Sequence, residues 1–430
     1  VSQSSEGKDA KLETHLQTPA THPDQGLLAT IRNVDQWLVN ACKRTAIPGD
    51  CVISTQLNDP SIEGPLHTLL AGYVGGLLLL GLTLSWLFPL GEYSLHSLYR
   101  NRLVRAYLGA SRDSRHPDMA TGFSSFDDFP LSDLAKNGNA QRPLLVINTA
   151  LNQTFGDKLG WQERKATSFT MSPLHCGSFF QVGYQRTEIY GGPVCLGTAM
   201  TISGAAASPN MGYHSSPLLA FVMTFFSIRL GSWLPNPGIH GNRNWSNQYP
   251  TIEIFPLISE LFGFATAKRR YVNLSDGGHF ENLGLYEMVA RRCKYIVVVD
   301  GGEDPNFEFE DLGNALRKIR IDLGIPIKFE KDSLVEPGPG EKPWFQATPK
   351  IAVAEIDYAA VDGQGVQCGK LIYLKPHLWK DISADILTFA RFNPEFPHQS
   401  TGDQFFTESQ FESYRALGFA LGQAALPSLS

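Results

Sequence analysis

Features that would indicate a metal-binding, disulfide-rich or nucleic-acid-binding protein are scarce in this sequence. Its six cysteines form no Cys-x-x-Cys pair, which argues against a zinc site built on paired thiolates. Cys42 and Cys51 close a short loop, for which a disulfide outside the cytoplasm and two ordinary thiols are the alternatives. The formal net charge of −6 at pH 7 leaves no basic footprint for nucleic acid. We therefore expect no nucleic-acid partner, no metal and no cofactor.

The beginning of the chain also lacks a signal peptide. Residues 1–24 are polar and contain no apolar core, and position 1 is Val instead of Met. We interpret this start as a truncation point. Residues 1–64 are predicted to form a polar arm followed by a short helical segment.

A long uncharged run is the clearest apolar feature. From Leu69 to Leu90 no residue carries a charge, and at about 1.5 Å per residue a helix of this run is about 33 Å long, enough to cross the hydrocarbon core. The run predicts a transmembrane helix over 65–91, and the alternative is a buried helix of a soluble domain.

The segment after this run, 92–142, is rich in arginine. Its arginines stand at positions 100, 102, 105, 112 and 115. By the positive-inside rule they predict an integral membrane protein whose carboxyl-terminal side is cytoplasmic. We interpret 92–142 as a basic juxtamembrane segment, in which the arginines are topological anchors or hold a short helix against anionic headgroups.

The remainder, 143–430, has the alternating pattern of an α/β domain. Short apolar runs rich in branched residues predict buried strands, at 143–152, 294–300, 351–358 and 369–376. Residues 310–323 place their apolar side chains on one face, which is typical of an amphipathic helix. The apolar run 218–228 is too short to cross a membrane and predicts a core helix or a membrane-skimming one.

Asp276 is the strongest candidate for a catalytic residue. It stands in VNLSDGGHFENLGLYEMVARRCKYIVVVD (272–300), which predicts a strand, a Gly-rich turn, a helix and a strand. Gly277 and Gly278 allow a sharp turn that leaves the carboxylate uncovered, and α/β enzymes commonly keep catalytic groups at the carboxyl ends of strands. Asn282 is in position to cap the following helix. A turn or capping role is the alternative for Asp276.

Several blocks together resemble the patatin-like and cytosolic phospholipases. SDGGHFENLGLYE resembles their Asp-Gly-Gly/Ala block, and LLVINTALNQTFG followed by SFTMSPLHCG resembles a central strand and hairpin. GTAMTISGAAASPNMGYHSS resembles the helix and loop that line their cleft, and FPHQSTGDQFFTESQFESYRALG is similar to the ending of a bacterial, membrane-bound branch. The resemblance covers roughly residues 92–424. It implies an incomplete patatin-like three-layer α/β/α sandwich over 143–430, preceded by the transmembrane helix.

The resemblance also implies a mechanism. In this family an aspartate and a serine in Gly-x-Ser-x-Gly form a catalytic dyad, so that Asp276 would take the serine proton and the serine would attack a lipid ester. The motif is absent: Asp113 stands where the second glycine would follow Ser111, and the segment around Ser178 also fails. The Gly-rich run for the oxyanion hole is missing too. We expect both to lie upstream of Val1 and this chain alone to be inactive.

Other polar residues have weaker claims to a catalytic role. Asp300 opens a second Asp-Gly-Gly after a strand and is the alternative base, although a turn role is preferred. His279 is interpreted as a packed or solvent-bonded histidine. Ser203 and Ser208 lie in a small-residue segment, where close packing is favoured over a nucleophilic role.

The remaining candidates are a loop and three single residues. The acids at 300, 303, 304, 308, 310 and 311 lack calcium-loop spacing and predict a solvated loop that caps the next helix. His398 is interpreted as a loop hydrogen-bonder, and Trp161 and Arg164 as the border of a lipid cleft. The leading functional hypothesis is a membrane-bound lipid acyl ester hydrolase of phospholipase or lipase type. The alternatives are a non-catalytic membrane protein that uses the fold as an interaction module, and a metal-dependent hydrolase on the acidic loop.

Overall fold

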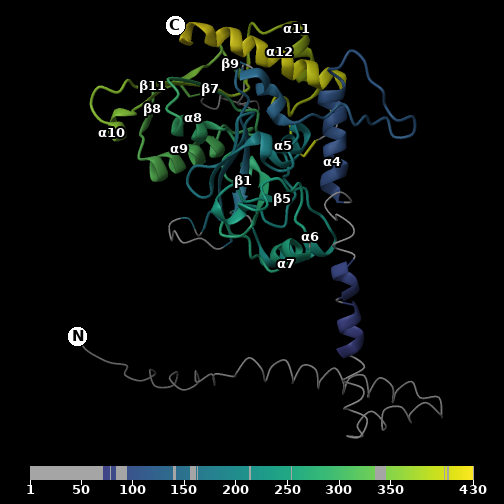
Figure 1. Ribbon diagram of the computed structural model, residues 1–430. Coiled ribbons are helices and arrows are strands. Elements are labelled where there is room, and N and C mark those ends of the chain that lie inside the picture. The colour runs from purple at the N-terminus through teal and green to yellow at the C-terminus, as the bar shows by residue number, and fades with distance from the viewer. Residues whose placement is uncertain are drawn as a thin grey trace, which may run out of the picture. The chain divides into compact units, whose positions relative to one another are not determined.

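A computed structural model describes most of the second half of the chain and part of the first. The described residues are 71–77, 79–83, 94–138, 142–154, 161, 163–212, 215–252, 254–334, 345–400, 402–403 and 406–429. They belong to two compact units, Val1–Thr83 and Leu84–Ser430. The described strands all lie in the second unit (Figure 1).

The prediction of a transmembrane helix over 65–91 is corrected. Within the described ranges, no helix is both long enough and apolar enough to cross a membrane. Of residues 65–91, segments 71–77 and 79–83 are helical, and the rest of this prediction lies outside the described residues, as do those for 1–64 and the Cys42–Cys51 loop. Absence of charge does not fix the length of a helix. The glycines at 72, 75, 76 and 81 each cost a helix about 1 kcal/mol relative to alanine.

A six-stranded antiparallel sheet forms the centre of the second unit. Its strands, in spatial order, are β4 (Gly183–Arg186), β3 (His175–Ser178), β2 (Ala166–Met171), β1 (Ile147–Asn152), β6 (Tyr271–Asp276) and β5 (Ser232–Pro235). Every neighbouring pair is antiparallel. The prediction of a patatin-like three-layer α/β/α sandwich is therefore wrong, and the described residues form a mixed α/β fold instead.

Connection lengths explain this difference. A parallel pair needs a crossover of about a dozen residues or more, whereas antiparallel strands are joined by short turns. Residues 172–174 join β2 to β3, and residues 179–182 join β3 to β4, so both connections can only form hairpins. The strand predicted at 143–152 and the hairpin at 168–177 are confirmed as β1 and the β2–β3 pair. Apolar runs show that strands are buried but do not show their direction.

A second sheet has four strands. Their spatial order is β7 (Tyr295–Val299), β11 (Gly369–Leu374), β10 (Ala352–Ile356) and β8 (Ile327–Phe329), and β7 pairs with β11 in parallel. The strands predicted at 294–300, 351–358 and 369–376 are confirmed, as is the helix at 310–323, which is α9 (Glu310–Leu323). β7 was predicted to be buried. It is an edge strand instead, and Tyr295, Val297 and Val299 are exposed on one of its faces.

The other elements surround these sheets. They are α4 (Leu95–Leu103), the π-helix η2 (Val104–Gly109), η3 (Leu131–Gly138), η5 (Thr187–Ile189), α5 (Leu196–Ser203), α6 (Pro217–Phe225), η7 (Ile239–Gly241), α7 (Ile254–Leu261), η8 (Gly277–His279), α8 (Leu285–Ala290), β9 (Phe345–Gln346), α10 (Ala359–Asp362), β12 (Leu378–Trp379), α11 (Ala384–Phe392), α12 (Glu408–Ala425) and η9 (Leu426–Leu429). One core cluster contains Phe169 and Leu274 of the six-stranded sheet, and another joins Leu285 of α8 to the four-stranded sheet. Residues 277–284 connect β6, which contributes Leu274 to the first cluster, to α8, which contributes Leu285 to the second.

Three of the arginines of segment 92–142 contact their own domain. Arg100 forms an ion pair with Asp128, 2.8 Å from Nη2 to Oδ2, and Arg115 forms one with Asp127. Arg112 donates a hydrogen bond to the Phe126 carbonyl. These contacts use donors that the sequence analysis assigned to membrane anchoring, and they hold the first part of the segment against its own residues 126–128.

Candidate active site

Asp276 lies where the sequence predicted it, at the carboxyl end of a strand. It is the last residue of β6 and pairs with Thr149 of β1. The Gly277–Gly278 turn follows directly as η8. A Cβ at Gly277 would stand 2.9 Å from the backbone oxygen of Asn148, so the close approach of β1 to this turn requires glycine.

The Asp276 carboxylate has an unusual electrostatic environment. Its Oδ1 accepts a hydrogen bond from the Gly278 amide at 2.7 Å, and it forms no ion pair with any residue that the structure describes. Burial raises the pKa of Asp276 above its ordinary value, and the Gly278 amide opposes this shift. The Tyr99 phenol of α4 is near enough for Asp276 to raise its pKa, after the larger effect of burial. A half-buried carboxylate with a raised pKa and no cation is suited to accepting a proton.

This environment predicts a stability effect with a definite sign. Because the pKa of Asp276 is higher in the folded than in the unfolded protein, protonation of this carboxyl stabilises the fold. This contribution is complete below the unfolded pKa and is lost as the pH rises through the folded pKa. At pH 7 we therefore expect Asp276→Asn to raise the melting temperature. The gain should disappear as the pH falls toward 3.8.

Asp118→Asn is the control, for which the melting temperature should change in the opposite direction. Hydrogen bonds from Thr121 lower the pKa of Asp118, so its replacement should lower the melting temperature at pH 7. Differential scanning calorimetry of both variants between pH 3 and pH 8 would be the measurement, a range that begins about one unit below the ordinary pKa of carboxyls and ends about four units above it. A lower melting temperature for Asp276→Asn at pH 7 would contradict the account of Asp276.

His279 is held by the protein through both ring nitrogens. Nε2 donates to the Ala206 carbonyl at 3.2 Å, and Nδ1 is 2.7 Å from the Ser275 hydroxyl. Since Ala206 offers only an acceptor, Nδ1 is the acceptor nitrogen and Ser275 the donor. These bonds support the interpretation of His279 as a packed histidine instead of a third catalytic group.

A buried polar network continues from His279 across the sheet. Asn152 Nδ2 donates to Ser275 Oγ and to Asn273 Oδ1, each at 2.8 Å. Asn273 Nδ2 in turn donates to Glu260 Oε1 at 3.1 Å. Satisfied buried networks of this kind fix side-chain positions, so the network orients the β6 residues that precede Asp276.

No described serine forms a hydrogen bond with Asp276. Ser203 Oγ donates to the Asn148 carbonyl at 2.8 Å, and Ser111 Oγ donates to a carbonyl in its own turn. Ser178 is buried on β3. None of these hydroxyls is activated by a neighbouring base, so the described residues contain an acceptor for a serine proton without its donor.

Several buried polar atoms of the second unit are unsatisfied, and some of them lie close to β6 and the Asp276 turn. Asn148 Oδ1, Ser208 Oγ and both amide atoms of Asn210 are buried and have no hydrogen-bond partner among the described residues. Asn148 lies next to the Asp276 turn, and a Cβ at Gly231 would stand 2.9 Å from Ser208 Oγ and 3.5 Å from Ser275 Cβ. Buried polar groups normally have partners, so these atoms are available to hydrogen-bond with a water molecule, a ligand or a further segment. The sequence analysis did not single out Asn148 or Asn210, although an asparagine inside an apolar strand, as Asn148 is, is a usable signal.

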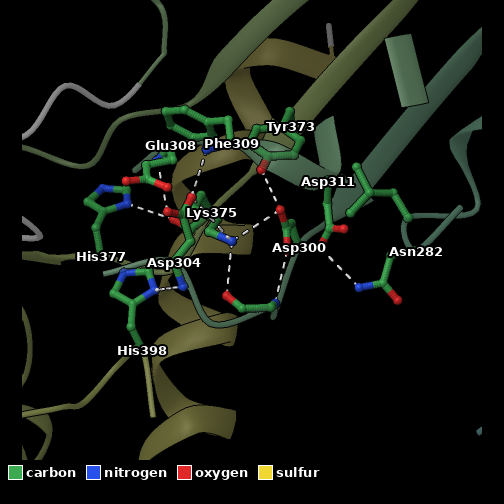
Figure 2. Close-up of polar contacts among 12 residues, drawn as sticks. Asn282, Asp300, Asp304, Glu308, Phe309, Asp311, Tyr373, Lys375, His377 and His398 are labelled. Carbon is green, nitrogen blue, oxygen red and sulfur yellow. Dashed lines mark hydrogen bonds and ion pairs between the residues drawn. The ribbon is translucent and has the colours of Figure 1, made fainter. Parts of the chain in front are cut away.

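The carboxylate of Asp300, the alternative base, is engaged by an ion pair and by hydrogen bonds with its neighbours (Figure 2). Its side chain is 2% exposed, and Oδ2 lies 3.2 Å from Lys375 Nζ, a side chain that is 3% exposed. Tyr373 donates to Oδ2, and the Gly302 amide donates to Oδ1 at 2.9 Å. Burial, followed by the Asp300 charge, raises the pKa of Tyr373, which keeps the phenol protonated. The second Asp-Gly-Gly is therefore a structural ion-pair site.

The acidic loop is only partly solvated and binds amides that precede the first helical residue of α9, which has no side-chain cap, so the prediction of a solvated capping loop is corrected. Asp304 accepts hydrogen bonds from the amides of Glu308 at 2.8 Å and Phe309 at 3.0 Å. His398 Nδ1 accepts from the Asp304 amide at 3.3 Å (Figure 2), so His398 bonds to the loop as predicted. Burial and then the charge of Lys375 lower the pKa of His398 to about 4. Among the described residues, no group of three or more His, Cys, Asp or Glu side chains is placed to hold a metal ion.

Asn282 does not cap α8. Its side chain donates to Asp311 Oδ2 at 3.0 Å, at the start of α9. Glu281 takes the capping role, because its carboxylate accepts from the amides of Leu283 at 2.6 Å and Tyr286 at 3.2 Å. The longer side chain of Glu281 reaches the helix start, which frees Asn282 to link the Asp276 turn to the acidic loop.

Trp161 and Arg164 bind a single carboxylate on α9. Trp161 Nε1 donates to Asp322 Oδ1 at 3.2 Å, and Arg164 Nη1 lies 2.6 Å from Asp322 Oδ2. Their polar ends are thus committed to Asp322. These contacts do not support the interpretation that Trp161 and Arg164 border a lipid cleft.

Comparison with known proteins adds no family assignment. No family profile matches the chain, and no curated protein matches it.

Proposed function

We propose that this chain supplies the general base of a membrane-bound serine lipid acyl hydrolase related to the patatin-like phospholipases. Asp276 carries this proposal: a half-buried carboxylate with a raised pKa, at a strand end, without a cationic partner among the described residues. The pKa of such a carboxylate lies closer to neutral pH than that of a solvated aspartate, so it is a better acceptor for a hydroxyl proton. The substrate class is a phospholipid or acylglycerol.

The serine is proposed to come from a segment outside these 430 residues. In support, the serines at 111, 178 and 203 make no contact with Asp276, and Asn148, Ser208 and Asn210 offer buried polar atoms that a docking segment would satisfy. The serine would transfer its proton to Asp276 and attack the ester carbonyl. Asp276 would pass this proton to the alcohol that leaves as the acyl-enzyme forms. Water would then attack the acyl-enzyme and give a proton to Asp276, which would return it to the serine as the fatty acid leaves. The proposal depends on the Asp276 turn and its surroundings and not on the sandwich fold, which the structure contradicts.

The experiment compares this chain with the polypeptide that also carries the sequence encoded upstream of Val1. The longer polypeptide should hydrolyse a fluorescent phospholipid in detergent micelles. A fluorophosphonate should label it on one serine, and peptide mapping should place that serine outside residues 1–430. Labelling of a serine within 1–430 would contradict the proposal. A folded longer polypeptide with neither activity nor labelling would favour the interaction-module alternative.

The chain of 430 residues alone should be catalytically silent. Without a nucleophile and an oxyanion hole, a general base has no group to activate. We expect no turnover of a short-chain nitrophenyl ester above that of heat-denatured protein. Turnover that is lost on Ser111→Ala or Ser203→Ala would contradict this expectation, and Ser333→Ala, on a loop beyond β8, is the matched control.

A further inference from the structure

Helices α6 and α7, with the residues that directly follow them, expose many large apolar side chains. The two helices pack against each other and lie together at one end of the second unit, away from α11 and α12 (Figure 1). The exposed residues, here named the α6–α7 surface, are Leu218, Leu219, Phe221, Val222, Phe226, Phe255, Ile258, Phe262 and Phe264. The run at 218–228 was predicted to be a core helix or a membrane-skimming one. With Leu218 74% exposed and Phe255 59% exposed, the structure excludes the core interpretation.

Three exposed cations adjoin this surface. Lys268, Arg269 and Arg270 follow α7 and line a cavity of about 600 Å³. Phe255 lines the same cavity, so the apolar surface and the basic side chains share an edge. Arg269 Nη1 donates to Ser259 Oγ of α7 at 2.6 Å, which holds its guanidinium beside the helix.

The one described acid of α7 is turned away from this surface. Glu260 is buried, accepts from Trp233 Nε1 at 2.7 Å and pairs with Arg229 at 3.5 Å. Burial raises the pKa of Glu260, and Arg229 opposes that shift. Apart from Glu253, which lies outside the described residues, the outward faces of α6 and α7 carry no carboxylate. The α6–α7 surface is therefore apolar with an edge of positive charge.

We propose that the α6–α7 surface lies in the interfacial region of an anionic phospholipid bilayer, with Lys268 and Arg270 at the headgroup phosphates. An apolar helical face flanked by Lys and Arg is the composition that binds such interfaces. A second copy of the chain fits less well, because a two-fold contact would bring the basic edges of two protomers together. The inference is independent of the proposed hydrolysis. Arg270 directly precedes β6, whereas Asp276 ends it six residues later, about 20 Å away at about 3.3 Å per residue.

Hydrogen–deuterium exchange on the whole chain tests this placement, because it reports each helix separately whatever else binds the vesicle. The chain is mixed with phosphatidylcholine vesicles that contain about a fifth phosphatidylglycerol. Peptides covering 217–228 and 254–264 should exchange at least about tenfold more slowly than without vesicles, since removal of one large apolar side chain from water is worth about that factor. Peptides of α12 should be unchanged.

Two variants and a matched control separate the apolar and basic contributions. Leu218→Glu/Phe255→Glu should abolish the protection, whereas Phe392→Glu/Phe411→Glu, at exposed positions on α11 and α12, should retain it. Lys268→Gln/Arg270→Gln should weaken binding to the anionic vesicles by about fivefold per charge and leave binding to pure phosphatidylcholine unchanged.

Three results would overturn the inference. One is unchanged exchange at 217–228 and 254–264 in chains that sediment with the vesicles. Another is protection that persists in Leu218→Glu/Phe255→Glu. The third is protection without vesicles that increases with protein concentration, which would identify a second copy of the chain as the partner. None of these results depends on lipid hydrolysis. The bilayer placement can therefore fail while the proposed hydrolase function holds, and the reverse is also possible.

Discussion

Asp276→Asn is expected to lower phospholipid turnover by about 10²–10⁴-fold in the polypeptide that carries the nucleophilic serine. Asparagine keeps the shape of the side chain and the hydrogen bond from the Gly278 amide, but it cannot accept the serine proton. Because the group acts on the reacting hydroxyl and not on the lipid, the loss should appear in kcat with KM almost unchanged. The assay uses a fluorescent phospholipid in micelles, with circular dichroism to confirm folding.

Two variants serve as controls for Asp276→Asn. His279→Ala removes a ring that bonds to Ser275 and Ala206, and Asp300→Asn changes a carboxylate enclosed by Lys375 and Tyr373. Both should retain most of the turnover when activity is expressed per folded protein. Near-normal turnover in Asp276→Asn together with its loss in either control would show that the base is misassigned.

Lys375→Met is expected to cause the largest loss of stability, about 3–5 kcal/mol. It leaves the Asp300 carboxylate 2% exposed and without its cation, and a buried unpaired charge is costly. The hydrogen bonds from Tyr373 and Gly302 compensate only part of this charge. Urea unfolding followed by circular dichroism is the measurement.

The double variant Asp300→Asn/Lys375→Met distinguishes a buried ion pair from simple packing. Removing both charges should restore most of the stability that Lys375→Met loses, because the uncompensated carboxylate is gone. Arg415→Met is the control at a solvent-exposed pair with Glu412, where only a small loss of stability is expected. A Lys375→Met loss no larger than the Arg415→Met loss would contradict the structural role of this ion pair.

The sequence predicted local elements better than their assembly. Asp276, Gly277 and Gly278 were placed correctly because a strand followed by two glycines is a local pattern, and α9 was placed correctly because its apolar period is local too. The direction of β1 relative to β2 and β6 is not a local property, and the prediction of a three-layer sandwich failed there. The hydrophobicity of a strand also did not distinguish an edge strand from a central strand of a sheet, so β7 was predicted to be buried.

Within the site, long-range contacts decided what the sequence left open. Asp276 and Asp300 both begin Asp-Gly-Gly after a strand, yet Lys375 and Tyr373, distant in sequence, neutralise only Asp300. Asn282 was predicted to cap α8 from its spacing alone, but Asp311 on another helix takes its amide. The exposure of the run at 218–228 likewise depends on which face packs against α7 and could not be obtained from composition.

Serine labelling tests the central claim most directly, because it reports activation of the nucleophile without lipid binding. The rate of fluorophosphonate labelling would be measured on the serine-bearing polypeptide and on its Asp276→Asn and Asp300→Asn variants, each confirmed to be folded. If Asp276 is the general base, Asp276→Asn should label at least about a hundredfold more slowly, while Asp300→Asn should label at nearly the parent rate. Labelling of Asp276→Asn at the parent rate would show that Asp276 does not activate the serine and would contradict the account.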